Sequence, residues 1–179
     1  MNDKERHQLA FQRPKSWMKQ KVYSATRKQK CFGLTTSNGK ILAFNIPWKW
    51  TAERWRDRVH AKVAPFLKRA FPGRTSFTIL LDGEKVFHAP VAKAAMAMHG
   101  IKALPGWPAS SPEFNTQESV WPVAESNLRD LEKSSDTFED FQVKVEKAVR
   151  SYPSPEKIVP GIAKRIRLGY DAKGGPIRK

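Results

Sequence analysis

The sequence predicts an α/β domain in which helices flank a mixed sheet. Three observations predict it: an Asn-Gly pair between two apolar runs, a strand–helix–strand succession over residues 76–104, and helical periodicity in the C-terminal third. With 179 residues, 40% of them hydrophobic, the chain can bury a sizeable core. Its single cysteine, Cys31, excludes a disulfide-stapled scaffold and a zinc site built on several thiolates.

The first predicted unit is a β-hairpin. Two apolar runs, Cys31–Ser37 and Lys40–Ile46, flank Asn38 and Gly39. Asn-Gly in this position is the strongest short hairpin signal, because both turn residues must tolerate positive φ.

A long basic helix is predicted next. Thr51 is a plausible N-cap, and apolar residues then recur at helical spacing as far as Ala70. Pro65 should kink or split this helix, since proline lacks the N–H that an inner turn requires. Pro72 and Gly73 should end it.

The middle of the chain predicts a parallel pair of strands. Ser76–Leu81 is an apolar run typical of a strand buried on both faces, Ala89–His99 is helical, and Ile101–Leu104 is a short strand. A strand, a helix and a second strand in this order imply a parallel pair with a right-handed crossover.

Helices are predicted for the rest of the chain. Asn115 with Glu118, and Asp136 with Glu139, each have the spacing of a capping box. One apolar face on the second of these helices is expected from Phe138, Phe141, Val145 and Val149. A third helix should open at Pro155 and be interrupted early by Pro160, and residues 169–179 should form a loose basic tail.

The charge is strongly positive and unevenly placed. Lys and Arg number 33 against 17 Asp and Glu, a net charge of +16, and residues 1–70 carry 17 of the cations. Such an excess points to a polyanion, most simply nucleic acid, although a solvated basic surface remains an alternative for any single run. The candidate nucleic-acid contacts are Lys19, Lys21, Arg27, Lys28, Lys30, Arg54 and Arg58.

Two carboxylates occupy informative positions. Asp82 directly follows the predicted central strand, where ligands of α/β sheets bind, and Glu118 lies in the first turn of a helix after a proline-rich loop. Taken singly, each has an ordinary explanation: a turn residue for Asp82 and a capping side chain for Glu118.

Together with their neighbours, these residues resemble the catalytic core of mariner-superfamily DDE transposases. The resemblance rests on Asp82, on His88 six residues later, and on the block Trp-Pro-Ala-Ser-Ser-Pro-Glu-Phe-Asn-Thr-Gln-Glu-Ser-Val-Trp over residues 107–121. The 35 residues between Asp82 and Glu118 are slightly more than is usual in that family. The resemblance implies an RNase H-like mixed sheet over residues 1–133, C-terminal helices over 134–168, and the tail over 169–179.

The family also has a third carboxylate on the first strand of the sheet. Asp3 is the position that matches it, and Lys4 stands where the family has a Glu. We therefore expect a catalytic domain truncated at its N-terminus, with its first strand largely missing.

The resemblance implies a DNA endonuclease and strand transferase. Asp3, Asp82 and Glu118 would hold two Mg²⁺ (or Mn²⁺) ions, with Asp82 bridging them, for cleavage at transposon ends and transfer into target DNA. The alternative is a non-catalytic nucleic-acid-binding module on the same fold. A homodimer is a possible oligomeric state. Nothing in the sequence predicts a membrane span or secretion, so we expect a nuclear protein in a eukaryote and a cytoplasmic or nucleoid one otherwise.

His88 has two interpretations at this stage. It could orient a metal ligand or a phosphate as an accessory residue of the site, or it could be a structural histidine at a helix N-terminus.

Overall fold

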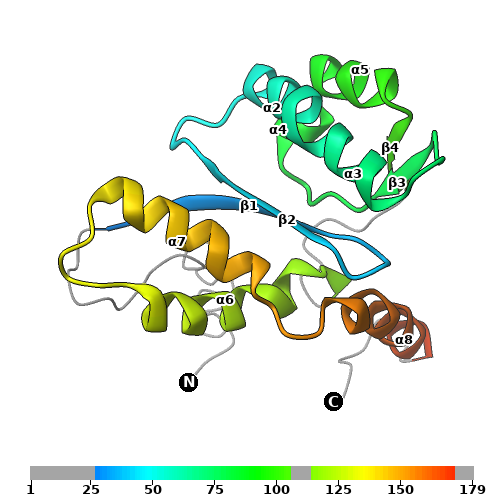
Figure 1. Cartoon of the computed structure of the whole chain (residues 1–179). Helices are drawn as coiled ribbons and strands as arrows, with labels where there is room; N and C mark the ends of the chain where they lie inside the picture. Colours follow the sequence, from blue (N-terminus) through cyan, green and yellow to red (C-terminus); the bar gives the residue numbers. More distant parts are fainter. Residues whose placement is uncertain (1–26, 106–113, 172–179) are drawn as a thin grey trace, which may run out of the picture.

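A two-stranded hairpin divides the molecule into two layers (Figure 1). The structure is a computed structural model that describes residues 27–105 and 114–171. Strands β1 (Lys30–Thr35) and β2 (Ile41–Ile46) pair antiparallel, with Thr35 opposite Ile41. Gly39 has a φ of 79°, so the hairpin predicted from Asn-Gly is confirmed.

The two faces of this hairpin differ in composition. Because side chains alternate along a strand, each face takes every second residue. One face, here called the aromatic face, consists of Phe32, Leu34, Leu42, Phe44 and Ile46. The other, here called the small-residue face, consists of Cys31, Gly33, Thr35, Ile41, Ala43 and Asn45.

The aromatic face is covered by the long basic helix (Figure 1). This helix consists of α2 (Ala52–Arg58), the π-helical segment η2 (Val59–Val63) and α3 (Ala64–Ala70). Thr51 caps it as predicted, accepting a bond from the Arg54 N–H. The split expected from Pro65 takes the form of a π turn, in which the Ala64 N–H bonds to the Val59 carbonyl just before the proline.

The same layer contains the parallel pair. Strand β3 (Phe77–Ile79) and β4 (Ile101–Ala103) pair parallel, and between them lie α4 (Lys85–His88) and α5 (Pro90–Met98). The expectation that the first strand is buried on both faces is wrong, because Thr78 is exposed between two buried residues. In the part of the chain that is described, the strands form two separate two-stranded sheets; the expected first strand falls on residues outside it.

The small-residue face is covered by C-terminal helices. Helices α6 (Gln117–Leu131) and α7 (Phe138–Arg150) pack on it, and η4 (Pro155–Lys157) leads into α8 (Ile158–Asp171) beside them (Figure 1). Pro160 lies within the first turn of α8 and does not interrupt it, since the first N–H groups of a helix have no partner inside it. The helix continues to Asp171, so residues 169–171 are helical and not part of a loose tail; the rest of the predicted tail lies outside the described residues.

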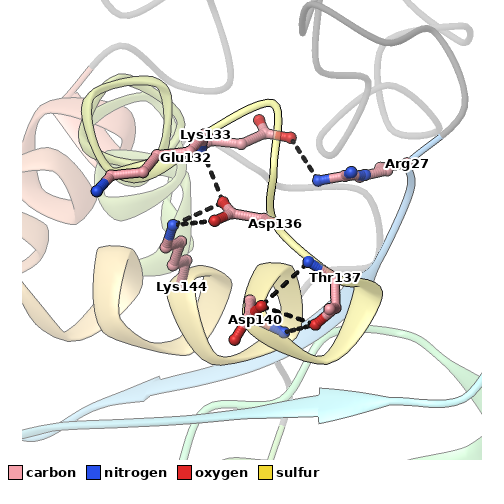
Figure 2. Close-up of polar contacts among 7 residues, drawn as sticks. All are labelled: Arg27, Glu132, Lys133, Asp136, Thr137, Asp140 and Lys144. Atoms are coloured by element: carbon pink, nitrogen blue, oxygen red, sulfur yellow. Dashed lines mark hydrogen bonds and ion pairs between the residues drawn. The ribbon is translucent and has the colours of Figure 1, made fainter.

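Both predicted capping boxes need correction. At α7 the box is one residue further on, formed by Thr137 and Asp140 (Figure 2). Asp136 instead pairs with Lys144 at 2.6 Å and accepts the Lys133 N–H, which shapes the turn between α6 and α7. At α6, Asn115 Oδ1 accepts the N–H of Gln117 at 3.0 Å rather than that of Glu118. The apolar face predicted for α7 also needs correction, because Phe138 is 44% exposed and Ala148 is buried on that face instead.

Candidate functional site

Asp82 lies three residues beyond the end of β3 and is held by its own loop. Leu81 is buried in the core, and the chain then turns outward so that the Asp82 side chain is exposed. Its Oδ1 accepts the Glu84 N–H at 3.0 Å. The Asp82 carbonyl lies 2.8 Å from His88 Nε2, and because a carbonyl can only accept, Nε2 carries the proton. One hydrogen bond therefore holds the carboxylate, and a second holds the main chain of the same residue.

His88 acts on this loop through the main chain. It is the last residue of α4 and its ring is exposed. Its contact is with the Asp82 carbonyl rather than with the carboxylate. The histidine thus ends α4, directly precedes Ala89, the N-cap of α5, and connects these helices to the loop after β3.

Glu118 enters the site from the opposite layer. It is half-buried in the first turn of α6, where its N–H bonds to the Asn115 carbonyl at 3.3 Å. Burial raises the pKa of Glu118, and the nearby charge of Asp82 raises it further. The two carboxylates, 35 residues apart in sequence, are therefore close enough to repel each other.

A further carboxylate near Asp82 was missed by sequence reasoning. The pKa of Glu84 is raised by burial and by the charge of Asp82, and is lowered by Lys30. Its signal in the sequence is the order Asp-Gly-Glu after the strand, which also has the composition of a turn.

The predicted basic residues lie in different environments. Arg27 pairs with Glu132 at 3.8 Å (Figure 2), and Arg54 Nη1 donates to the Lys49 carbonyl at 2.7 Å. Arg58 is half-buried over the Phe44 ring, with 5.6 Å from its guanidinium carbon to the ring centroid.

Two of the predicted cations are exposed beside the hairpin. Lys28 and Lys30 both extend into solvent, and the Lys30 ammonium lies 5.5 Å from the centroid of the Trp48 ring. Lys19, Lys21 and the expected third carboxylate, Asp3, lie outside the residues that the structure describes.

The carboxylates fit a divalent cation without forming a complete cage. Carboxylate oxygens are the ligands that Mg²⁺ prefers, and a cation would relieve the repulsion that raises the pKa of Glu118. Within residues 27–105 and 114–171, no group of three or more His, Cys, Asp or Glu side chains is arranged to hold a metal ion. The described residues thus provide a pair of carboxylates.

Comparison with known proteins identifies the class. Residues 2–142 match the family described as DDE superfamily endonuclease, and the chain belongs to that family. The fold matches a solved structure, the crystal structure of the catalytic domain of Mos1 mariner transposase, with a TM-score of 0.68 and 15% identity over 99% of this chain and 98% of that chain. This confirms the predicted resemblance and the RNase H-like α/β fold, whereas the predicted mixed sheet is present in the described residues as two separate pairs of strands. No curated protein matches the sequence. None of the helices described is long and apolar enough to cross a membrane.

Proposed function

We propose that this chain is a DDE transposase catalytic domain that cleaves DNA phosphodiester bonds and joins DNA strands. The observation that carries the proposal is that Asp82, in the loop after β3 of one layer, lies close enough to Glu118, in the first turn of α6 of the other, for its charge to raise the pKa of Glu118. Family membership supports the class of reaction, and the net charge of +16 supports a DNA substrate.

Asp82 and Glu118, with Asp3 as the third carboxylate, would hold the Mg²⁺ or Mn²⁺ ions. When bound, such ions supply positive charge at the reacting phosphate and make a bound water more acidic. In cleavage, a water oxygen bonds to phosphorus while the bond to the 3′ oxygen breaks, and that oxygen takes up a proton. The hydrogen bonds of Asp82 to Glu84 and His88 support its role, because the carboxylates must be in place before the substrate arrives.

The basic residues would guide DNA to these carboxylates. Lys28 and Lys30 are exposed near the hairpin, and the Lys30 charge acts on Glu84, which places it close to Asp82. The proposed phosphate contacts are Lys19, Lys21, Arg27, Lys28, Lys30, Arg54 and Arg58. In a eukaryotic cell the substrate places the protein in the nucleus, and the work of joining two transposon ends is compatible with a homodimer.

The test is Mg²⁺-dependent nicking of a supercoiled plasmid by wild type, Asp82→Asn and Glu118→Gln. We expect each variant to lose on the order of 100-fold or more in nicking rate, since each removes a negative oxygen ligand from the site. Binding to the same plasmid in EDTA should be unchanged or slightly tighter, because a negative charge leaves the phosphate path. Glu125→Gln, further along α6, is the matched control and should nick like wild type.

The second candidate function is a non-catalytic nucleic-acid-binding module. The positive charge favours it independently of the carboxylates. It predicts a wild-type protein that binds the plasmid in EDTA and nicks it with neither Mg²⁺ nor Mn²⁺. That result would refute the enzyme proposal and leave the binding function standing.

A further inference from the structure

The first turn of α6 is anchored to the hairpin by a residue that the site does not use. Gln117, the residue before Glu118, is only 8% exposed although it is polar. Its Nε2 donates to Thr35 Oγ1 at 2.9 Å, across 82 positions of sequence. Its own N–H bonds to Asn115 Oδ1, while the N-cap residue Thr116 makes no side-chain capping bond. The helix start is therefore held by a local bond to Asn115 and by a tertiary contact with β1.

Gly33 provides the space for this contact. A Cβ at position 33 would lie 2.5 Å from Gln117 Oε1 and 3.0 Å from Trp121 Cη2. Gln117 and Trp121 are four residues apart, so both project from the same side of α6 onto the same glycine. We call these four residues, Gly33, Thr35, Gln117 and Trp121, the Gly33 contact. A larger residue at position 33 would force the Gln117 amide and the Trp121 ring away from the strand.

The amide of Gln117 is not an efficient way to stabilise the fold. Within the described part of the chain its Oε1 is buried without a hydrogen-bond partner. A buried polar atom without a partner opposes folding, and replacing both members of a buried polar pair by apolar groups of similar shape is often neutral or stabilising. The hydrogen bond to Thr35 does, however, fix direction, which an apolar contact does less well.

We propose that the Gly33 contact is a positioning device that sets the rotation and depth of the first turn of α6, and thereby the place of the Glu118 carboxylate relative to Asp82. Successive side chains of an α-helix diverge by about 100°, so holding Gln117 against β1 directs Glu118 to one side of the strand. Gln117 is a positioning residue, since it acts through its neighbour. The inference rests on the proposed function. It adds Gln117, which the sequence analysis did not single out, to the residues that this function uses.

The first experiment compares Gly33→Ala with Gly161→Ala. Gly161 lies in α8, and a Cβ there would meet nothing within 4 Å, so it controls for the substitution itself. For Gly33→Ala we expect at least a tenfold rise in the Mg²⁺ concentration that gives half-maximal plasmid nicking. We also expect at least a tenfold weaker binding of Mn²⁺ alone, measured by electron paramagnetic resonance. Gly161→Ala should match wild type. Wild-type metal dependence in Gly33→Ala would overturn the proposal.

The second experiment separates positioning from stability. The double variant Thr35→Val with Gln117→Met removes the hydrogen bond and the unpaired oxygen at similar volume. We expect it to melt at or above the wild-type temperature and yet to show the same loss of Mn²⁺ affinity. Unchanged affinity in a folded double variant would contradict the positioning role.

A third readout does not depend on metal or activity. Hydrogen exchange of the Glu118 and Ser119 amides should be at least tenfold faster in the double variant, while amides in α7 keep their rates. If wild type neither nicks DNA nor binds Mn²⁺, the proposed function fails, and the exchange rates still decide the positioning contact. Unchanged rates in the first turn of α6 would refute it.

Discussion

Both faces of the hairpin pack against apolar side chains, but the small-residue face adds directed polar contacts to this packing. On the aromatic face, the Phe32 ring packs 4.9 Å from Phe44 and 5.0 Å from Trp55, between ring centroids. On the small-residue face, Asn45 bonds to the Gln142 carbonyl and to Glu146, and Thr35 bonds to Gln117. The apolar packing depends on buried area and the polar contacts on direction.

This difference bears on the site because its two carboxylates come from opposite layers. Asp82 belongs to the layer on the aromatic face, and Glu118 to the layer on the small-residue face. The hairpin between them is the common reference for both. We infer that aromatic packing keeps the layers together, while the polar contacts determine where the helices lie on the hairpin.

The largest effect is expected on the aromatic face. Trp55→Ala should lower the free energy of unfolding by about 3–5 kcal/mol, because a large, fully buried ring is removed from the core. Urea denaturation measures it. Trp48→Ala is the matched control, since Trp48 is 64% exposed, and it should change stability little. A loss below about 1.5 kcal/mol for Trp55→Ala would show that aromatic packing does not dominate this layer.

A smaller loss is expected on the small-residue face. Asn45→Ala removes the Nδ2 bonds to the Gln142 carbonyl at 2.9 Å and to Glu146 Oε1 at 3.0 Å, and should cost about 1–3 kcal/mol in urea denaturation. Asn127→Ala is the control, because its two bonds are 3.4 Å long, and it should cost less. A cost for Asn45→Ala equal to that of Trp55→Ala would remove the contrast between the faces.

The smallest effect is a pH dependence at the turn between α6 and α7. The hydrogen bond from Lys144 is the main cause that lowers the pKa of Asp136 in the folded protein, and the Lys133 N–H adds to it (Figure 2). The unfolded chain then binds this proton more readily, so stability is present above the ordinary Asp pKa and is lost as pH falls through the lower folded value.

Asp136→Asn should therefore flatten the fall in unfolding free energy at acidic pH. The measurement is urea denaturation at a series of pH values from about 5 to about 2. Glu139→Gln, in the first turn of α7, is the control and should keep the wild-type slope. An Asp136→Asn profile parallel to wild type would mean that the ion pair does not persist in solution.

The sequence predicted those elements whose signals are local. Asn38 and Gly39 specify a tight turn, which consists of Ser37, Asn38 and Gly39, and Thr51 specifies a helix start, so the hairpin and the basic helix were confirmed. The α7 cap was one residue off because two overlapping Ser/Thr/Asp–x–x–Asp/Glu patterns occur there. The interaction that decides between them is the pairing of Asp136 with Lys144, eight residues away.

The features that were missed depend on contacts between layers. Gln117 reads as an ordinary polar residue at a helix start, and only the approach of α6 to Gly33 reveals that it is buried. Similarly, Asp82 and Glu118 were paired by family resemblance. Their mutual repulsion is visible only once the two layers are assembled on the hairpin.

The single thiol of the chain reports on the joint between these layers. Cys31 lies on the small-residue face against both α6 and α7, and burial raises its pKa to about 12, with a further contribution from the charge of Glu146. Alkylating reagents attack the thiolate, so the raised pKa slows the labelling of this half-buried thiol at neutral pH. A rise in its labelling rate would therefore report that the helical layer has moved away from the hairpin.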